Sequence, residues 1–556
     1  MATSKDEKII ATEMVSPAPC RDGAMSSVAF DASRAEDAEH LMSIKQGLKL
    51  YPKAIGWSVL LSSALVMEGF QTMILPNLFS QSAFQKRFGI HDGKGGYQIS
   101  APWQSGLSNG AGVGAFIGLF FAGTSTERIG YRKTMMVALA AITGFIFVVF
   151  FAHSLTMLLI GEILCGLCWG IFQTTTMTYA SEVCPVALRA YLTTYCNLCW
   201  VIGQFIAACV LKAVADKTGE YAYKIPFAVQ WIWPIPILIG VYFAPESPWW
   251  LVRKERYEDA TKALLRLTSP GRLDNFNPQE SISMMVYTTE LERSQQEGTT
   301  FLDCFKGADR RRTEVVCLTY AVQNLCGSTI MGYSTYFMIQ AGMSPSHSFG
   351  MSIGQYGMGA IGTISSWFMM SKIGRRTLYL YGTAILGAVL LVVGGLGSVS
   401  TDNTDAQWAI GVHLLIYTFI YDATVGPVCY SLVPELSSTR LRNISVVLAR
   451  NLYNIIGIVL NVLTPRMLNP TAWAWGAKAA YFWVGSCALC CTWIYFRLPE
   501  PKGRTYAELD VLFKNRTPAR KFKSTVVDPF AEVLGTEKHR EMEDGAVHIE
   551  KVRDVV

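Results

Sequence analysis

Four charged side chains lie inside long apolar stretches of this 556-residue chain: Glu68, Glu162, Asp422 and Arg450. A charge at the middle of a lipid bilayer costs about 2.5–3.5 kcal/mol on insertion scales, so each is a candidate for function. A carboxylate buried without a partner can bind and release a proton, whereas an arginine stays charged and needs an acidic partner. We expect Asp422 or Glu68 to pair with Arg450. Asp422 is favoured because its apolar stretch directly precedes that of Arg450. The alternative for Glu68 and Glu162 is a structural ion pair or a water-facing position.

Amides, hydroxyls and aromatic rings also recur in the apolar stretches. Asn197, Trp200 and Gln204 follow the spacing i, i+3 and i+7, which places them on one face of a helix. Similar groups occur later in the chain, namely Gln323, Asn324, Thr329, Tyr430, Tyr453 and Asn454. Such groups suit a small polar ligand whose hydroxyls donate and accept hydrogen bonds and whose C–H faces pack on rings. The alternative for each amide, and the simpler interpretation of Trp200, is packing between helices.

Three charged loop motifs occur twice, in the same order and at offsets that agree within about ten residues. In the first half they contain Gly123, Glu127, Arg128, Gly130, Arg132 and Lys133, then Glu182 and Arg189, then Pro245 and Glu246. In the second half they contain Ser371, Lys372, Gly374, Arg375 and Arg376, then Glu435 and Arg442, then Pro499 and Glu500. Two homologous halves with apolar helices between their motifs are how many membrane transporters are built.

The composition predicts an all-α membrane protein. Hydrophobic residues make up 51% of the chain and charged residues only 16%, and the mean hydropathy is +0.27. A soluble protein would carry about 25% charged residues. Apolar runs of about 20 residues, long enough to cross a bilayer, recur without the alternation of a membrane barrel. The net charge of +6 fits charged loops rather than a nucleic-acid surface.

Twelve spans are predicted, in two groups of six. They lie near 56–78, 101–123, 134–152, 155–180, 191–213, 226–244, 313–338, 347–371, 378–400, 407–430, 443–464 and 474–497. The domains are then a tail (1–50), a six-helix bundle (51–244), a central loop (245–312), a second bundle (313–497) and a tail (498–556). Lysine and arginine in the motif loops place both tails and the central loop in the cytoplasm. We expect disorder after about residue 515.

The sequence does not resemble an enzyme. We find no nucleophile–base pair, metal-ligand set or phosphate-binding loop in it. Cys165 and Cys168 form a C-x-x-C pattern, but they lie in an apolar helix, where small packing residues are expected. We therefore expect no cofactor and no bound metal.

The repeated motifs resemble those of the sugar porter family of the major facilitator superfamily, over about residues 50–515. That family carries G-x-x-x-D-R-x-G-R-R loops, a P-E-S-P motif after its sixth span and a P-E-T-K-G motif after its twelfth. Longer segments resemble the fungal maltose and α-glucoside permeases: Gly161 to Gln173, Tyr191 to Gln204 and Tyr421 to Tyr430. The resemblance implies the superfamily fold, with twelve transmembrane helices in two pseudo-symmetric six-helix bundles.

The resemblance also assigns roles to residues. The positions of Asn197, Gln204, Gln323, Asn324, Thr329, Tyr430 and Tyr453 line the sugar site of such porters, and Asn454 lies beside the last. The motif acids and bases form a network that closes the inner side, although they could also simply set topology. Proton-coupled members carry an aspartate where this chain has Gln71, which cannot titrate. Glu68, one helical turn away, could take over the proton.

We therefore expect a plasma-membrane importer of an α-glucoside such as maltose, working by alternating access with proton symport. Its partners would be the sugar, the proton and the bilayer, with no nucleic acid, and the protein would be a monomer. The alternatives are a nutrient sensor of transporter form, a uniporter for another disaccharide, and an exporter of a small fungal metabolite.

Overall fold

The computed structural model describes residues 34–35, 42–91, 96–215, 217–269, 276–296, 301–399, 403–438, 441–502, 504 and 506–525. Contacts within the chain divide it into two units. The first unit comprises residues 1–55, 182–189 and 245–297, and the second comprises residues 56–181, 190–244 and 298–556. Each unit is described by itself.

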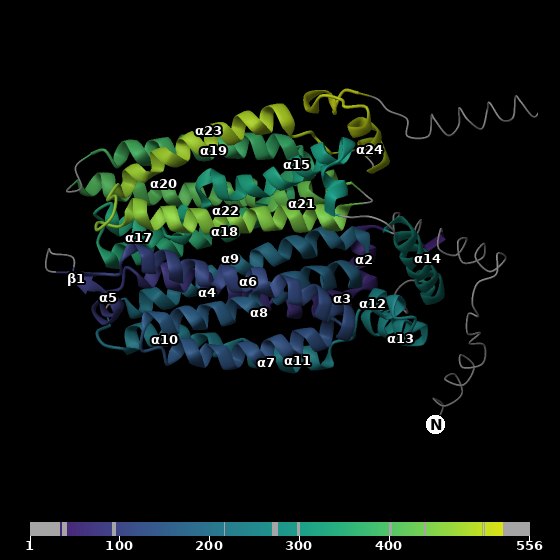
Figure 1. Cartoon of the computed structure of the whole chain (residues 1–556). Helices are drawn as coiled ribbons and strands as arrows, with labels where there is room; N and C mark the ends of the chain where they lie inside the picture. Colours follow the sequence, from purple (N-terminus) through teal and green to yellow (C-terminus); the bar gives the residue numbers. More distant parts are fainter. Residues whose placement is uncertain are drawn as a thin grey trace, which may run out of the picture. The chain divides into compact units, whose positions relative to one another are not determined.

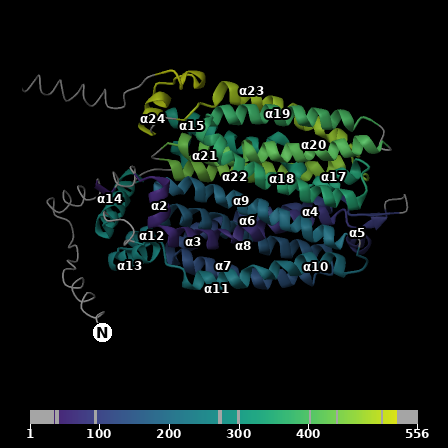
Figure 2. The same cartoon turned by 180° about the vertical axis from the view of Figure 1, so that it is seen from behind.

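Long helices of the second unit run side by side in two groups (Figures 1 and 2). The amino-terminal group contains α3 (Pro52–Ser62), α4 (Ala64–Leu78), α6 (Ala101–Ile129), α7 (Tyr131–Phe150), α8 (Leu155–Val183), α9 (Val186–Val214), α10 (Tyr221–Val229), η2 (Gln230–Ile232) and α11 (Pro234–Phe243). The first few residues of α3 and α9 and the last of α8 belong to the first unit.

The carboxyl-terminal group begins with a helix that is interrupted twice. It contains α15 (Gly307–Gln323), η5 (Asn324–Ser328), α16 (Thr329–Gly332), α17 (Ser334–Gln340), α18 (Pro345–Lys372), α19 (Arg375–Leu396), α20 (Thr404–Ala423), α21 (Val425–Leu436), α22 (Arg442–Leu468), η6 (Gly476–Ala479) and α23 (Ala480–Arg497). Among the described residues, eleven helical stretches are long and apolar enough to cross a membrane. The glycine-rich α18, also long enough, occupies the place of the eighth predicted span. The prediction of an all-α membrane protein is confirmed.

The two ends of the second unit are distinguished by their loops. At one end, α5 (Ser82–Phe88) precedes a small antiparallel hairpin of β1 (Ile90–His91) and β2 (Tyr97–Gln98). We call this the hairpin end. The opposite end carries Gly130 and Gly374, where α6 turns into α7 and α18 into α19. We call it the motif end.

Glycines let pairs of helices in the amino-terminal group approach until their backbones touch. A Cβ added to Gly114 of α6 would lie 2.0 Å from the carbonyl oxygen of Ile163 in α8. A Cβ on Gly69 of α4 would lie 2.2 Å from the carbonyl oxygen of Trp200 in α9. Small residues at such contacts are how helices pack in lipid, where the hydrophobic effect does not drive association.

The first unit consists of short helices: α2 (Ile44–Leu50), α12 (Pro248–Arg253), α13 (Tyr257–Leu267) and α14 (Pro278–Gln296). Ser43 begins α2 with a reciprocal pair of hydrogen bonds to Gln46, a capping box. The side chain of Ser247 caps α12 by accepting a hydrogen bond from the Trp250 N–H, and Pro248 occupies the first helical position. Tyr51 packs edge-on against Phe276, with ring centroids 6.3 Å apart.

The carboxyl-terminal segment is ordered beyond the point where we expected order to end. Helix α24 (Tyr506–Lys514) is followed by η7 (Ala519–Lys521), and Phe522 is fully buried. Arg311 of α15 donates to the carbonyl oxygen of Thr517 at 2.7 Å, and its guanidinium lies over the Phe513 and Phe522 rings. The expectation of disorder after residue 515 is therefore wrong for residues 516–525, because arginine–aromatic contacts, invisible in a polar sequence, hold them.

Candidate functional site

Close packing of α4 against α9 positions the first part of the site. Gly203 of α9 is as tightly placed as Gly69, since a Cβ there would lie 2.0 Å from the carbonyl oxygen of Val66. Glu68 and Gln71 lie on α4 around this contact, and Asn197 and Gln204 flank it on α9. Two glycine contacts thus bring the predicted amides and the predicted carboxylate to the same level of the bundle.

Interrupted helices position the second part. Gly327 has a φ of +100° inside η5, so the regular α-helix stops between α15 and α16. The carbonyl oxygens freed there accept hydrogen bonds from Ser486 at Leu325 and from Tyr417 at Cys326, at 2.6 and 2.9 Å. Non-helical backbone at membrane depth is tolerated only where such groups are satisfied or line a cavity.

A second break separates α20 from α21 at Thr424, where the backbone leaves helical geometry (φ −128°, ψ −77°). Pro427 lacks an N–H, so the helix cannot continue its regular hydrogen bonding there. Gln323 donates to the carbonyl oxygen of Gly426 at 2.8 Å, and Asn324 donates to that of Tyr453 at 2.9 Å. The donors of these two predicted site amides thus bind neighbouring helices, as the packing interpretation would have them.

Aromatic rings gather where the two groups of helices meet. Tyr320 lies edge-on to both Tyr430 and Tyr453, each with ring centroids 6.0 Å apart. Trp200 of α9 lies nearly parallel to Tyr430 of α21 at 6.5 Å. The cluster therefore joins the predicted site residues Tyr430 and Tyr453 of the carboxyl-terminal half to Trp200 of the amino-terminal half, through a ring contact that also fits the packing interpretation of Trp200.

Arg450 lies beside this aromatic cluster. Its guanidinium is 4.7 Å from the ring centroid of Tyr453 and 5.8 Å from that of Tyr320. Nη2 of Arg450 donates to Oε1 of Gln173 at 3.1 Å, and Nε2 of Gln173 donates to Oε1 of Glu68 at 2.5 Å. Gln173 of α8 was not among our predicted site residues. Its signal in the sequence is a polar residue inside an apolar span, which is weaker than the signal of a charged residue.

The second intramembrane carboxylate is held by amides. Nε2 of Gln71 donates to Oε1 of Glu162, and Nε2 of Gln230 donates to Oε1 of Gln71. All three side chains are buried. Gln71 is therefore the middle member of a hydrogen-bonded row that runs from Gln230 in η2 to Glu162 in α8. Gln230 is a second residue that the sequence analysis did not predict.

Asp422 does not pair with Arg450 in the part of the chain that the structure describes, which corrects our expectation. The carboxylate is 6% exposed, and a Cβ on Gly359 of α18 would lie 2.6 Å from its Oδ2. Helix α20 packs against α18 and α19, whereas α22 packs against α15 and α6. Adjacency along the chain therefore misled us, because the two helices contact different neighbours.

The remaining predicted site residues are partly buried and lack partners at specific atoms. In the described structure, Nδ2 of Asn197 and Oγ1 of Thr329 are buried without a hydrogen-bond partner, and so is Oε2 of Glu68. Gln204 and Asn454 are also partly buried. Most buried polar atoms in proteins are hydrogen-bonded, so these three atoms are candidates for binding a ligand.

The motif charges of the carboxyl-terminal half come together at the motif end. Arg375 lies 3.4 Å from Glu435, and its backbone N–H donates to Oε1 of Glu500 at 2.8 Å. A Cβ on Gly374 would lie 2.1 Å from Oε2 of Glu500, which explains the glycine. Arg376 donates to the carbonyl oxygen of Tyr495 at 2.8 Å.

The motif charges of the amino-terminal half are divided between the two units. In the first unit, Glu182 accepts hydrogen bonds from Arg253 at 2.7 Å and from Ser247, and Oε1 of Glu246 accepts from the Ser247 N–H at 3.2 Å. Arg253 was not predicted. In the second unit, Glu127, Arg128 and Arg132 lie where α6 ends and α7 begins. The side chains of Arg189 and Arg442 lie outside the described residues.

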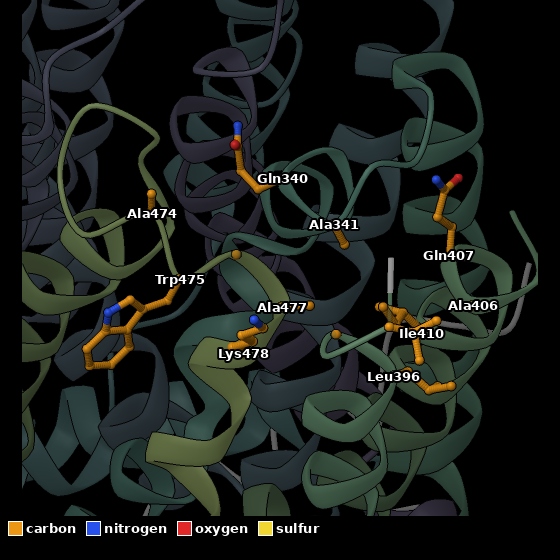
Figure 3. A pocket seen from close by; sticks show the side chains of 13 residues that line it. Gln340, Ala341, Leu396, Ala406, Gln407, Ile410, Ala474, Trp475, Ala477 and Lys478 are labelled. Carbon is orange, nitrogen blue, oxygen red and sulfur yellow. The ribbon is translucent and has the colours of Figure 1, made fainter. Parts of the chain in front are cut away.

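A hollow of about 220 Å³ lies at the hairpin end of the carboxyl-terminal half (Figure 3). It is lined by Gln340, Gln407, Lys478 and the backbone around Trp475, among others. None of the predicted site residues lines it. We therefore do not assign it to the site between the halves.

The fold and the site define a multi-pass membrane transporter rather than an enzyme. The profile of the family described as Sugar (and other) transporter matches residues 57–513, and the chain belongs to this family. The resemblance to sugar porters and fungal permeases is thereby confirmed.

Two curated yeast proteins illustrate the relationship. The chain is 42% identical over 521 residues to a general alpha-glucoside permease of Saccharomyces cerevisiae, covering 93% of this chain and 84% of the relative. It is 43% identical over 506 residues to maltose permease MAL31 of the same species, covering 90% of this chain and 82% of the relative.

Solved structures of the xylose transporter XylE from Escherichia coli share the fold. An inward open conformation matches with a TM-score of 0.66 at 17% identity, covering 83% of this chain and 99% of that one. A partially occluded inward open conformation matches with a TM-score of 0.65 at 16% identity, covering 82% and 99%. The predicted major facilitator superfamily fold is confirmed.

Proposed function

We propose that this chain imports an α-glucoside such as maltose across the plasma membrane. The relatives that are named maltose and α-glucoside permeases support this substrate class, because they match along more than four fifths of their length. The chemistry of the site agrees. Phenols and an indole offer flat surfaces to sugar C–H faces, and amides and hydroxyls offer both donors and acceptors.

The observation that carries the proposal is that three predicted site residues have buried polar atoms without a hydrogen-bond partner in the described structure. Nδ2 of Asn197 is a donor, Oγ1 of Thr329 is both donor and acceptor, and Oε2 of Glu68 is an acceptor when ionised. Leaving such atoms unsatisfied costs about 1–3 kcal/mol each. The hydroxyls of a sugar could satisfy such atoms.

Transport would proceed by alternating access between two halves, residues 51–244 and 313–497, joined by residues 245–312. The hairpin end would face outward and the motif end the cytoplasm, with both termini inside, since the motif loops are rich in arginine and lysine. Charge contacts such as Arg375–Glu435 and Arg253–Glu182 would then belong to the inner latch. We propose that one chain is sufficient for transport.

Side chains of both halves meet at the hairpin end, which supports a state closed to the outside. Lys212 of α9 donates to the carbonyl oxygen of Ser346 at 2.8 Å, and Asn109 of α6 donates to that of Ile458 at 3.2 Å. Tyr333 of the second half donates to Ser108 at 2.7 Å. Opening outward would require these bonds to break together.

Proton symport is the proposed energy source, with Glu68 as the main proton carrier. Glu68 is buried, its Oε2 has no hydrogen-bond partner in the described structure, and its Oε1 is linked to Arg450 through Gln173. Glu162 and Asp422 are further candidates, because both are buried carboxylates without an ion-pair partner in the described residues.

Uniport is the second candidate function, and Gln71 favours it. This side chain cannot titrate, and both its amide atoms are already engaged, with Gln230 and Glu162. A carrier whose α4 position is fixed in this way could conduct sugar down its gradient without a proton.

The two candidates are distinguished by uptake of labelled maltose in yeast lacking its own disaccharide permeases. Symport predicts that a protonophore abolishes uptake, and that Glu68→Gln does so as well. Uptake that ignores the protonophore would establish uniport. If the protein reaches the surface and takes up no α-glucoside, the proposed substrate class is wrong.

A further inference from the structure

A row of three polar side chains crosses from one half of the second unit to the other at the aromatic cluster. Arg450 of α22 donates to Oε1 of Gln173, and Nε2 of Gln173 in α8 donates to Oε1 of Glu68 in α4, at 3.1 and 2.5 Å. The neutral member, Gln173, is hydrogen-bonded to both the arginine and the carboxylate. Through such a contact, a change in the charge of a residue in one half can affect the other half.

The direction of hydrogen bonding in the row is fixed. Arginine can only donate, so the amide oxygen of Gln173 must face Arg450 and its NH₂ group must face Glu68. An ionised carboxylate is the best acceptor for that group. Hydrogen bonds to charged partners are about twice as strong as neutral ones, so the row is strongest while Glu68 is ionised.

Glu68 also has room for a proton. Its Oε1 is occupied by Gln173, whereas its Oε2 is buried without a partner in the described structure. A proton on Oε2 would leave the bond from Gln173 in place but would remove the charge that strengthens it. Protonation of Glu68 therefore weakens the hydrogen bond from Gln173 but does not break it.

The surroundings of the row contain few competing charges. Among the described residues, the other ionisable groups within electrostatic range of Glu68 or Arg450 are the phenols of Tyr320, Tyr430 and Tyr453 and the thiol of Cys429, and the neutral indole of Trp200 also interacts with Glu68. Glu162 lies further along, bound to Gln71 one helical turn beyond Glu68 on α4. Neutral phenols do not balance the positive charge of Arg450, so the negative charge of Glu68 contributes to stabilising it.

We propose that Gln173 is a positioning residue that couples the charge of Glu68 to the docking of the two halves. When Glu68 is ionised, the row holds α8 and α22 together. When Glu68 binds a proton, the hold weakens and the halves can separate around the sugar. The inference rests on the proposed proton-coupled sugar transport and deepens it by naming the residue that transmits the proton's effect.

The test compares two transport modes in membrane vesicles containing the full-length protein. One mode is proton-driven accumulation of labelled maltose, and the other is exchange of labelled for unlabelled maltose at equal pH on both sides. For Gln173→Met, which keeps the volume and removes both hydrogen bonds, we expect accumulation to fall at least about tenfold, as for losing a bond to a charged group. Exchange should stay within about threefold of wild type, and the pH dependence of uptake should flatten.

Gln81→Met is the matched control. Gln81 is a buried glutamine at the start of α5, and its Nε2 donates to the carbonyl oxygens of Val214 and Ala222, at 3.2 and 3.0 Å, within the amino-terminal group. The same substitution there makes the same change in polarity and also removes hydrogen bonds, but none that joins the two halves. We expect it to leave accumulation, exchange and the pH profile unchanged.

The outcomes separate the two proposals. Wild-type uptake that is insensitive to a protonophore would end the proton-coupling proposal and this inference with it. If wild type is coupled and Gln173→Met retains its accumulation and pH profile, the inference alone is overturned. If Gln173→Met is absent from the membrane, Gln173→Glu decides, since it can accept from Arg450 but, when ionised, cannot donate to Glu68. Normal coupling in that variant would also overturn the inference.

Discussion

The hydroxyl of Thr329 is buried in α16 without a partner, and this gives a prediction at the scale of one residue. Thr329→Val keeps the shape and removes the unsatisfied oxygen, so the free energy of unfolding should stay equal or rise by about 1 kcal/mol. If a sugar hydroxyl binds this oxygen, the KM for maltose should rise about three- to tenfold. Melting of the purified protein and uptake kinetics measure the two effects.

Thr335→Val provides the control at the same scale. The hydroxyl of Thr335 is equally buried but satisfied, 2.6 Å from the hydroxyl of Ser352. Its removal should lower stability by about 1 kcal/mol and leave KM alone. A KM for Thr329→Val equal to that of wild type would remove Thr329 from the sugar site.

At the scale of the residue, the sequence predicts the charged residues of the site but not the residues to which they are hydrogen-bonded. Glu68, Glu162 and Arg450 were conspicuous because charge is rare in apolar stretches, and the structure brings Glu68 and Arg450 to the same row. Gln173 was missed because a neutral amide in a membrane helix is common and its importance depends on what lies across the interface. Which acid approaches Arg450 could not be predicted, since that depends on helix neighbours rather than on chain order.

At the scale of the element, α6 allows a matched pair of substitutions. Gly114→Ala would place a Cβ 2.0 Å from the carbonyl oxygen of Ile163, whereas a Cβ on Gly112 would meet nothing within 4 Å. We expect Gly114→Ala to destabilise the protein by about 1–3 kcal/mol through overpacking of α6 against α8. Gly112→Ala should stay within about 0.5 kcal/mol of wild type. Thermal stability of the two purified variants tests this, and equal melting temperatures would refute the contact.

Helices could be predicted from length and hydropathy, but their interruptions could not. The spans near 313–338 and 407–430 were expected to be continuous, whereas the structure breaks them at η5 and at Thr424. Pro427 was a visible warning of the second break. The first depends on a positive φ at Gly327, and many glycines in this chain have ordinary helical geometry.

At the scale of the whole molecule, the hairpin end should control access from outside. Lys212→Met combined with Asn109→Leu removes two donors that join the halves there. Each bond contributes about 1 kcal/mol, so the loss of both should raise the minor population that is open to the outside about thirtyfold. The check is the rate at which a membrane-impermeant thiol reagent modifies Ser105→Cys, with the parent lacking that cysteine as control. An unchanged rate would mean that these bonds do not hold the closed state.

The contacts at the hairpin end have an evolutionary consequence. Asn77, Ser105, Asn109, Lys212 and Asn469 all donate to main-chain carbonyl oxygens of the other half. A main-chain acceptor is present whatever residue occupies the position, so Gly332, Val462, Ile458 and Ile99 can mutate without losing the bond they accept. Ser346 would keep its main-chain bond but lose the bond that its hydroxyl accepts from Lys212 at 2.6 Å. The donors have no such freedom. Drift at these main-chain acceptors should therefore be one-sided, whereas the side-chain pair of Tyr333 and Ser108 would have to change together.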